Sequence, residues 1–150
     1  MVQATERVDM QAIVAALYKA ARCAQVLSTG DPLDPGTARI LSSVVRTGPV
    51  RLSAVAQENH IDLSTASRHI DTLVRRGLVA KSPDPTDARA TLLDGTQHGR
   101  QVLKVLLENR SAAIAPALVG WAERDRRSLE RLLVRLAGDL DSLVCTQEHR

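Results

Sequence analysis

The chain has 150 residues, of which 44% are apolar, 25% charged and 1% aromatic, and this is the composition of one ordinary globular domain. It has no apolar stretch long enough for a membrane-spanning helix or a secretory signal, so the sequence predicts a cytoplasmic protein with no membrane partner. Cys23 and Cys145 are too few for a disulfide framework and lack the spacing of a zinc site. Because the common phosphate-loop, metalloprotease and nucleophile-elbow motifs are also missing, we expect no enzyme, no cofactor and no metal.

The net charge of +3 and the isoelectric point near 9.3 indicate an anionic partner, but the charges are spread along the chain. Residues 1–59 carry six basic and five acidic side chains, residues 60–99 carry five of each, and residues 100–150 carry nine and seven. Charge alone therefore does not locate a nucleic-acid surface, and any such surface has to be identified from the residue pattern.

The first part of the chain predicts two amphipathic helices. Apolar residues recur every three or four positions between Val8 and Leu27, which is helical spacing, and Gly30 follows as a terminator. The second helix is predicted to begin after Asp34, with Asp34 as its N-cap and a proline in its first turn, and to end at Gly48.

The next two predicted helices are short. Ser53 can cap a third helix that reaches Asn59, and Asp62 can cap a fourth that runs to Arg76. Gly77 fits the position just after the fourth helix, where a left-handed backbone is common. Two short helices joined by a tight turn predict a helix-turn-helix.

The fourth predicted helix has two contrasting faces. Its apolar face consists of Ala66, Ile70, Leu73 and Val74. Small hydroxyl residues and arginines make up the other face: Ser64, Thr65, Arg68, Thr72 and Arg75. Small polar groups let a helix enter the major groove of DNA closely, and an arginine one turn further on can reach a guanine edge or a phosphate. The alternative interpretation is a solvated surface without a ligand.

A β-hairpin is predicted directly after this helix. Residues 78–82 and 90–93 have strand character and flank the turn-forming segment 83–89. A hairpin in this place makes a winged helix, so the fold class is mainly α with a small β-hairpin wing. We expect Asp87 to accept hydrogen bonds from the Arg89 guanidinium and to direct it into a minor groove. An ordinary surface ion pair is the alternative.

The C-terminal third predicts two more helices with long apolar stripes. One begins at Gln97 and ends near Pro116 and Gly120. The other carries leucines at alternating spacings of four and three: Leu129, Leu133, Leu136, Leu140 and Leu143. These helices have more leucine side chains than a small winged helix can bury, which favours a second copy of the chain as the partner that buries them. An intramolecular helix bundle is the alternative.

Over about residues 35–145 the sequence resembles the MarR family of bacterial transcriptional regulators. The matching patterns are Leu52-Ser53-x-x-Ala56, Ser64-Thr65-Ala66-Ser67-Arg68-x-Ile70-Asp71, Asp84-Pro85-x-Asp87-x-Arg89 and Thr96-x-x-Gly99-Arg100. The sequence departs from the family pattern at Gly95, where an apolar residue is usual, and at Ala122, where a Ser or Thr cap is usual.

The resemblance implies a homodimer that binds a palindromic operator in double-stranded DNA, as a repressor that a small-molecule effector releases. It implies one domain over residues 1–150, with a winged helix-turn-helix at 35–95 and N- and C-terminal dimerisation helices at 8–27 and 97–145. Together with the helix pattern, it gives the expected DNA-binding residues: Ser64, Thr65, Ser67, Arg68, His69, Arg75, Asp87 and Arg89. His69 is expected to contact phosphate or solvent rather than a metal.

The competing function is that of a winged-helix module that docks a protein partner through its leucine-rich helices. Such a module needs neither the Asp87/Arg89 pattern nor the hydroxyl-rich helix start.

Some members of the family sense oxidants through a cysteine in the first helix. Cys23 lies in that helix, but its aliphatic surroundings predict a buried thiol without a redox role. The effector-binding residues are not assigned.

Overall fold

The computed structural model describes residues 9–147, except for the side chains of Ala88, Cys145 and Gln147, and it divides into two compact units between Ala113 and Ile114. Val8, where the first predicted helix begins, lies outside the described residues. The first unit contains α1 (Met10–Leu27), α2 (Pro35–Thr47), β1 (Val50–Arg51), α3 (Leu52–Glu58), α4 (Leu63–Arg75), β2 (Val79–Asp84), β3 (Asp87–Gly95) and almost all of α5 (Gln97–Ile114). The second contains the short 3-10 helix η1 (Ala115–Leu118) and α6 (Glu123–Gln147).

Three local signals at helix ends are confirmed. Asp34 caps α2 by accepting a 3.0 Å hydrogen bond from the backbone N–H of Thr37, and Pro35 occupies the first turn. Asp62 caps α4 in the same way, and Gly77 follows α4 with a φ of +68°, in the left-handed region. These caps fix where α2 and α4 begin, and so they set which side chains lie in the first turn of α4.

The predicted cap of the third helix is wrong. α3 begins at Leu52, one residue before Ser53, and its N-cap is Arg51, whose side chain makes no capping hydrogen bond. The reason is a strand that the sequence analysis did not predict, because Val50 and Arg51 form β1 and pair with Leu93 and Leu92 of β3. The chain therefore enters α3 directly from a strand.

The predicted hairpin is confirmed, but it belongs to a three-stranded antiparallel sheet with the order β1-β3-β2. Its two strands extend further than expected, to Asp84 and from Asp87, so that only Pro85 and Thr86 lie between them. Pro83 is compatible with the longer β2 because β2 is an edge strand, where a missing backbone N–H is tolerated. We refer to the β2–β3 hairpin as the wing.

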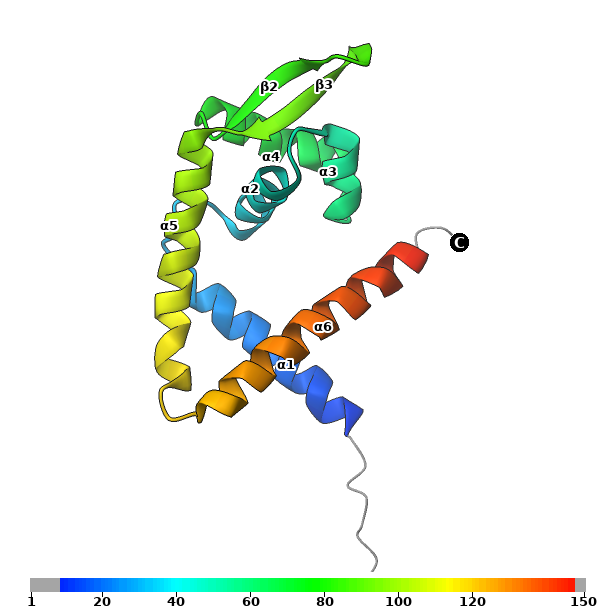
Figure 1. Cartoon of the computed structure of the whole chain (residues 1–150). Coiled ribbons are helices and arrows are strands. Elements are labelled where there is room, and N and C mark those ends of the chain that lie inside the picture. Colours follow the sequence, from blue (N-terminus) through cyan, green and yellow to red (C-terminus); the bar gives the residue numbers. More distant parts are fainter. Residues whose placement is uncertain (1–8, 148–150) are drawn as a thin grey trace, which may run out of the picture. The chain divides into compact units, whose positions relative to one another are not determined.

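The core lies between α2, α4, the sheet and α5, with α2, α3 and α4 packed beneath the wing (Figure 1). The predicted apolar face of α4 is confirmed, since Ala66, Ile70 and Leu73 are buried. The largest fully buried apolar side chains come from α2, α3, α4 and α5 and from Leu78, next to the sheet: Ile40, Leu41, Val44, Val55, Ile70, Leu73, Leu78 and Leu106. This core holds the opposite, polar face of α4 in a fixed orientation at the surface.

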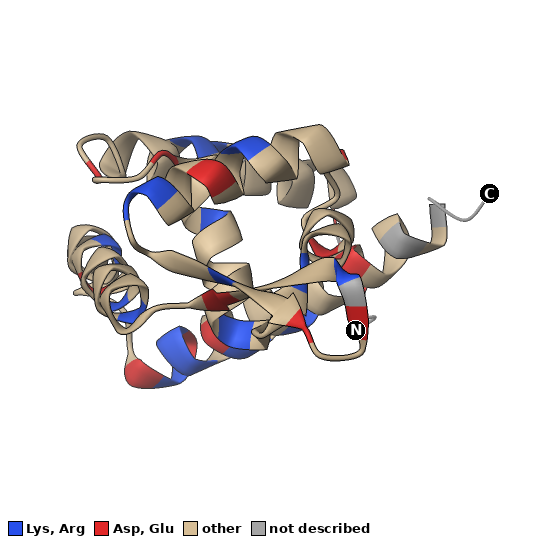
Figure 2. Cartoon of the chain, turned by 90° about the horizontal axis from the view of Figure 1, so that it is seen from above, with Lys and Arg blue, Asp and Glu red and all other residues tan. Residues whose placement is uncertain are grey.

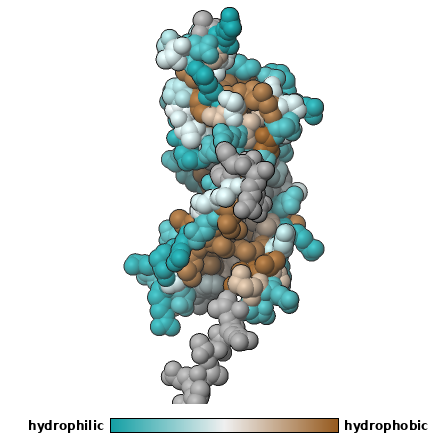
Figure 3. Space-filling view, turned by 90° about the vertical axis from the view of Figure 1, so that its right-hand side faces the viewer, coloured by the Kyte–Doolittle hydropathy of each residue, from teal (hydrophilic) through white to brown (hydrophobic). Residues whose placement is uncertain are grey.

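The helices α1 and α6 differ from this core because neither has a buried side chain among its described residues. Large apolar side chains lie at the surface of each helix, and such brown patches are visible in Figure 3. Tyr18 of α1 is 76% exposed and Leu143 of α6 is 61% exposed. No helix in the described part of the chain is long and apolar enough to cross a membrane.

The expected burial of Cys23 is wrong for the single chain. Its side chain is exposed on α1, because the aliphatic face around it has no cover within the first unit. The side chain of Cys145 lies outside the described residues, so its expected burial stays a prediction.

Candidate nucleic-acid interface

The N-terminal turn of α4 is organised by the carboxylate of Asp62. It accepts hydrogen bonds from the hydroxyls of Ser64 and Thr65, the latter at 2.6 Å, and from the backbone N–H of Thr65 at 2.8 Å. These donors, the Ser64 hydroxyl first, hold the pKa of Asp62 well below its usual range. Both predicted DNA-contact hydroxyls therefore direct their protons to Asp62 in the free protein, and their oxygens keep lone pairs that can accept hydrogen bonds.

The arginines of α4 lie further along the same polar face. Arg68 and Arg75 are both exposed. Arg75 donates a 3.1 Å hydrogen bond from Nη2 to the Thr72 hydroxyl, and that hydroxyl donates to the backbone carbonyl of Arg68 at 3.0 Å. Ser67 is half-buried beside them. The face thus presents two guanidinium groups about two helical turns apart.

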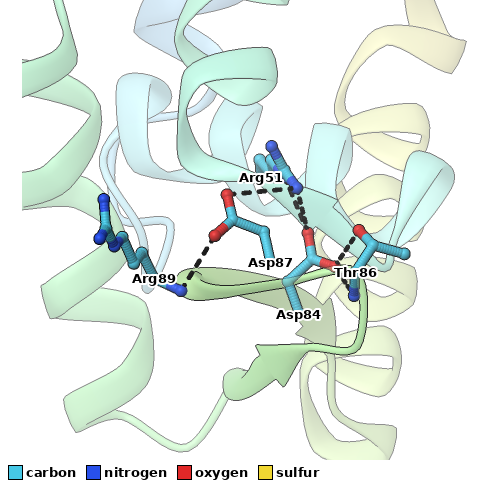
Figure 4. A network of polar contacts seen from close by, with 5 residues as sticks. All are labelled: Arg51, Asp84, Thr86, Asp87 and Arg89. Carbon is cyan, nitrogen blue, oxygen red and sulfur yellow. Dashed lines mark hydrogen bonds and ion pairs between the residues drawn. The ribbon is translucent and has the colours of Figure 1, made fainter.

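A network of polar contacts supports the turn of the wing, and its central residue, Arg51, was not predicted from the sequence. The Arg51 guanidinium donates two hydrogen bonds to Oδ2 of Asp84, at 2.8 Å from Nε and 2.6 Å from Nη2. The other oxygen, Oδ1, accepts from the backbone N–H and the hydroxyl of Thr86, at 2.8 and 2.6 Å. Figure 4 shows Arg51 reaching the wing from β1. The network therefore fixes the two-residue turn at the tip.

The electrostatics of Asp84 follow from these four donors. Asp84 is only 7% exposed, and the hydroxyl and backbone N–H of Thr86, together with Arg51, lower its pKa to about 2. A buried carboxylate that is paired and fully hydrogen-bonded is ionised at neutral pH, and removing one partner leaves a costly charge. Asp84 is thus a structural anion of the wing.

The expected bond between Asp87 and the Arg89 guanidinium is wrong. Asp87 instead accepts a 3.0 Å hydrogen bond from the backbone N–H of Arg89, and its other oxygen lies 3.9 Å from Nη2 of Arg51. A carboxylate two residues before a backbone N–H forms this local turn readily, which explains the preference. In Figure 4 the Arg89 side chain extends away from Asp87, and Arg89 is exposed. Asp87 therefore shapes the backbone, and the guanidinium stays available for a ligand.

His69 of α4 is tied to the first turn of α2. Its Nδ1 lies 2.8 Å from the hydroxyl oxygen of Thr37, and that hydroxyl donates a 2.6 Å hydrogen bond to Oδ2 of Asp34. His69 is half-buried and Thr37 is buried. The spacing of Asp34 and Thr37 predicts the cap, but no sequence signal joins Thr37 to a residue 32 positions away. One edge of the expected contact residue His69 is thus occupied by the protein itself.

A surface ion pair joins the wing to α4. Nζ of Lys81 in β2 donates to Oδ1 of Asp71 at 3.0 Å, and both side chains are about half exposed. Such exposed pairs contribute at most about 1 kcal/mol, so this one adds little to the stability of the fold. Acidic and basic residues are interspersed along the ribbon in Figure 2, in agreement with the scattered charges of the sequence.

Residues 31–90 match the MarR family. A curated relative from Bacillus subtilis (strain 168), named as the uncharacterized HTH-type transcriptional regulator YxaD, is 29% identical over 97 residues, which are 65% of this chain and 68% of the relative. Among solved structures, RV1404 from Mycobacterium tuberculosis has a TM-score of 0.73 at 27% identity, covering 90% of this chain and 97% of that chain.

A further solved structure was determined together with DNA. FabT from Streptococcus pneumoniae in complex with DNA has a TM-score of 0.72 at 19% identity, covering 90% of this chain and 99% of that chain. At this identity the likeness shows a shared fold. The fold is therefore one that has been crystallised in complex with DNA.

Proposed function

Because residues 31–90 match the MarR family and the fold is that of winged-helix regulators, we propose that this chain is a member of the family and that it represses transcription by binding a palindromic operator in double-stranded DNA as a homodimer. The observation that carries the proposal is the wing, where a buried carboxylate fixes the turn and leaves the guanidinium of Arg89 exposed beyond it. Because the backbone of the turn is already fixed, less conformational entropy is lost when Arg89 enters a narrow minor groove.

In this proposal α4 lies in the major groove. Arg68 contacts a base edge or the phosphate next to it, and Arg75 contacts the backbone from the far end of the helix. Ser64, Thr65 and Ser67 lie where α4 comes closest to the bases, and their small side chains let the helix enter the groove. The hydroxyls of Ser64 and Thr65 donate their hydrogen bonds to Asp62. These two side chains therefore contact DNA as hydrogen-bond acceptors for base amino groups.

The homodimer is supported by the uncovered helices. Proteins ordinarily bury apolar faces like those of α1 and α6. A second copy related by a two-fold axis has the same two faces, so the two copies can bury them against each other. A two-fold protein matches a palindromic site, because each copy meets one half-site with the same residues. The FabT structure in complex with DNA supports the same kind of ligand for this chain.

Release by a small effector is supported by a cavity in the first unit. It has a volume of about 190 Å³ and lies between Pro32, in the α1–α2 loop, and one side of α5. Its walls are Val102, Val105 and Leu106 with the polar groups of His98, Gln101 and Asn109. A cavity of roughly 150 Å³ accommodates benzene, so this one suits a single-ring compound. The loop that forms it is also bound by Arg76, which donates to the Pro32 carbonyl at 2.7 Å from the end of α4.

The test is a selection of bound fragments from sheared genomic DNA with the full chain, followed by titration of an enriched duplex at several salt concentrations. We expect a palindromic sequence to be enriched, and we expect affinity to fall by about a thousandfold between 50 and 200 mM salt, as for proteins with several phosphate contacts. Enrichment of no sequence, or an affinity that salt leaves unchanged, would favour the protein-docking alternative.

A further inference from the structure

The contact between His69 and α2 also determines which nitrogen of the His69 ring carries hydrogen. A hydroxyl has one proton to donate, and the Thr37 hydroxyl contacts two groups at hydrogen-bond distance, Oδ2 of Asp34 at 2.6 Å and Nδ1 of His69 at 2.8 Å. An ionised carboxylate can only accept. Thr37 must therefore donate to Asp34, and Nδ1 of His69 must donate to Thr37.

The charge state of Asp34 supports this assignment. The hydroxyl of Thr37 and then its backbone N–H lower the pKa of Asp34, so the carboxylate is ionised at neutral pH. In a neutral imidazole only one nitrogen carries hydrogen. With the hydrogen on Nδ1, the second nitrogen, Nε2, is left as a hydrogen-bond acceptor.

One small residue lies beside that acceptor. His69 is half-buried, and its Nδ1 edge faces the buried Thr37. Gly36 lies against the other edge, where a Cβ would be 3.1 Å from Cε1 and 3.3 Å from Nε2 of His69. The glycine is thus the one residue type that adds no side chain beside Nε2.

We propose that Thr37 is a positioning residue for sequence reading, which holds His69 so that Nε2 accepts a hydrogen bond from the exocyclic amino group of an adenine or cytosine in the major groove. The inference rests on the proposed function, because it needs α4 to lie in that groove. In the major groove, adenine N6 and cytosine N4 are the donors, while guanine and thymine present acceptors that repel a lone pair. His69 and Arg68 lie in the same turn of α4.

The first test measures the tautomer in the free protein. Imidazole nitrogen shifts of ¹⁵N-histidine-labelled full chain are recorded at pH 8, above the range where histidines ordinarily titrate, and His69→Gln identifies the signal. We expect the Nδ1–H tautomer in the wild type and in Thr37→Ser, which keeps the hydroxyl. Thr37→Val should shift the ring towards Nε2–H. An Nε2–H ring in the wild type, or a Thr37→Val spectrum like the wild type, overturns the inference.

The second test uses a library of randomised duplexes. Wild type and Thr37→Ser should enrich adenine or cytosine at one position of each half-site. In Thr37→Val that preference should fall about fivefold, the effect of one hydrogen bond of about 1 kcal/mol, while the preferences at other positions stay unchanged. Uniform loss at every position would indicate a structural role for Thr37 and would contradict the inference.

Gly36→Ala keeps the test decisive if Thr37→Val folds poorly, because alanine favours a helix more than glycine does. It should retain the Nδ1–H tautomer and still lose the base preference, since its methyl group crowds Nε2. Full preference in this variant contradicts the inference. If the wild type enriches no duplex, the proposed function fails and the inference fails with it. If it enriches duplexes without a position that depends on Thr37, only the inference fails.

Discussion

The winged helix and the helices α1 and α6 have the same kind of apolar periodicity, but they use it differently. Leucines and valines of α2, α4 and the sheet meet one another and are almost fully buried. The corresponding residues of α1 and α6 remain exposed on the single chain, among them Leu27, Leu133 and Leu140. Helical periodicity thus identifies the apolar face of a helix that has to be buried, but it does not show whether the same chain or a second chain buries it. We infer that the winged helix is self-sufficient, and that the other two helices need a second copy.

The largest expected effect is on the dimer. Replacing Leu133 and Leu140 by lysine removes four leucines from a two-fold interface, at about 1.5 kcal/mol each. The loss of roughly 6 kcal/mol raises the dimer dissociation constant by about four orders of magnitude. Sedimentation equilibrium at micromolar concentration should show a monomer, whereas Ser142→Lys, on the opposite side of the helical pattern, should remain a dimer. A dimeric double variant would mean that α6 does not form the interface.

The core of the winged helix gives the next largest effect. Leu73 of α4 is fully buried, and Leu73→Ala should lower the free energy of unfolding by about 2–5 kcal/mol, as cavity-forming substitutions do. The matched control is Leu63→Ala on the same helix, where the leucine is 54% exposed and the loss should be below about 0.5 kcal/mol. Urea unfolding measures both. Equal losses would contradict a self-sufficient core.

Within the proposed DNA interface, α4 and the wing should differ in specificity. Arg68→Ala should cost about 1–3 kcal/mol per half-site on operator and less on scrambled duplex, because a base contact is lost. Arg89→Ala should weaken both duplexes by similar factors, and more so with A·T-rich flanks. Arg124→Ala, an exposed arginine of α6, controls for the lost charge. If Arg89→Ala binds both duplexes as tightly as the wild type, the wing assignment is wrong.

The wing should respond to acid before the core does. The folded pKa of Asp84, about 2, lies below the usual value near 3.9, so its contribution is fully present above that usual value and is lost as the pH falls towards about 2. The protection factor of the Thr86 amide, which is the intrinsic exchange rate divided by the measured rate at the same pH, should therefore fall over that acidic range. Asp84→Asn should show fast exchange already at neutral pH and weaken DNA binding by less than Arg89→Ala does. Slow Thr86 exchange in Asp84→Asn would show that Asp84 does not fix the turn.

The smallest expected effect is that of peroxide. Although Cys23 is exposed on the single chain, its neighbours are aliphatic and only Arg22 is adjacent in sequence, which is not the electropositive setting of a sensor thiol. We expect mild peroxide to leave operator binding unchanged, as measured by anisotropy. Binding that is lost on oxidation, restored by a dithiol and unaffected in Cys23→Ser would overturn this expectation.

The sequence predicts the parts of this fold that depend on neighbouring residues. The caps at Asp34 and Asp62 and the left-handed Gly77 each rely on contacts within a few positions, and all three are confirmed. The strand β1 was missed because two residues carry no periodicity, and its pairing partner lies about forty positions further along the chain.

The same distinction applies to the candidate site. The exposed arginines of α4 and the wing follow from local pattern, but the contacts of Arg51 with Asp84 and of Thr37 with His69 span 33 and 32 positions. Asp87 shows a subtler failure, because the pattern identified the residue and assigned it the wrong partner atom. Tertiary contacts therefore decide which side chains are available to a ligand.

The central claim, that two copies of this chain bind one DNA duplex, is tested most directly by the stoichiometry of the complex. Sedimentation velocity of the full chain with a duplex enriched from genomic DNA, at micromolar protein, gives the mass of the bound species. The account predicts a dimer without DNA and two chains on each palindromic duplex. A monomer that binds one chain per duplex, or a chain that does not sediment with the duplex at all, would contradict it.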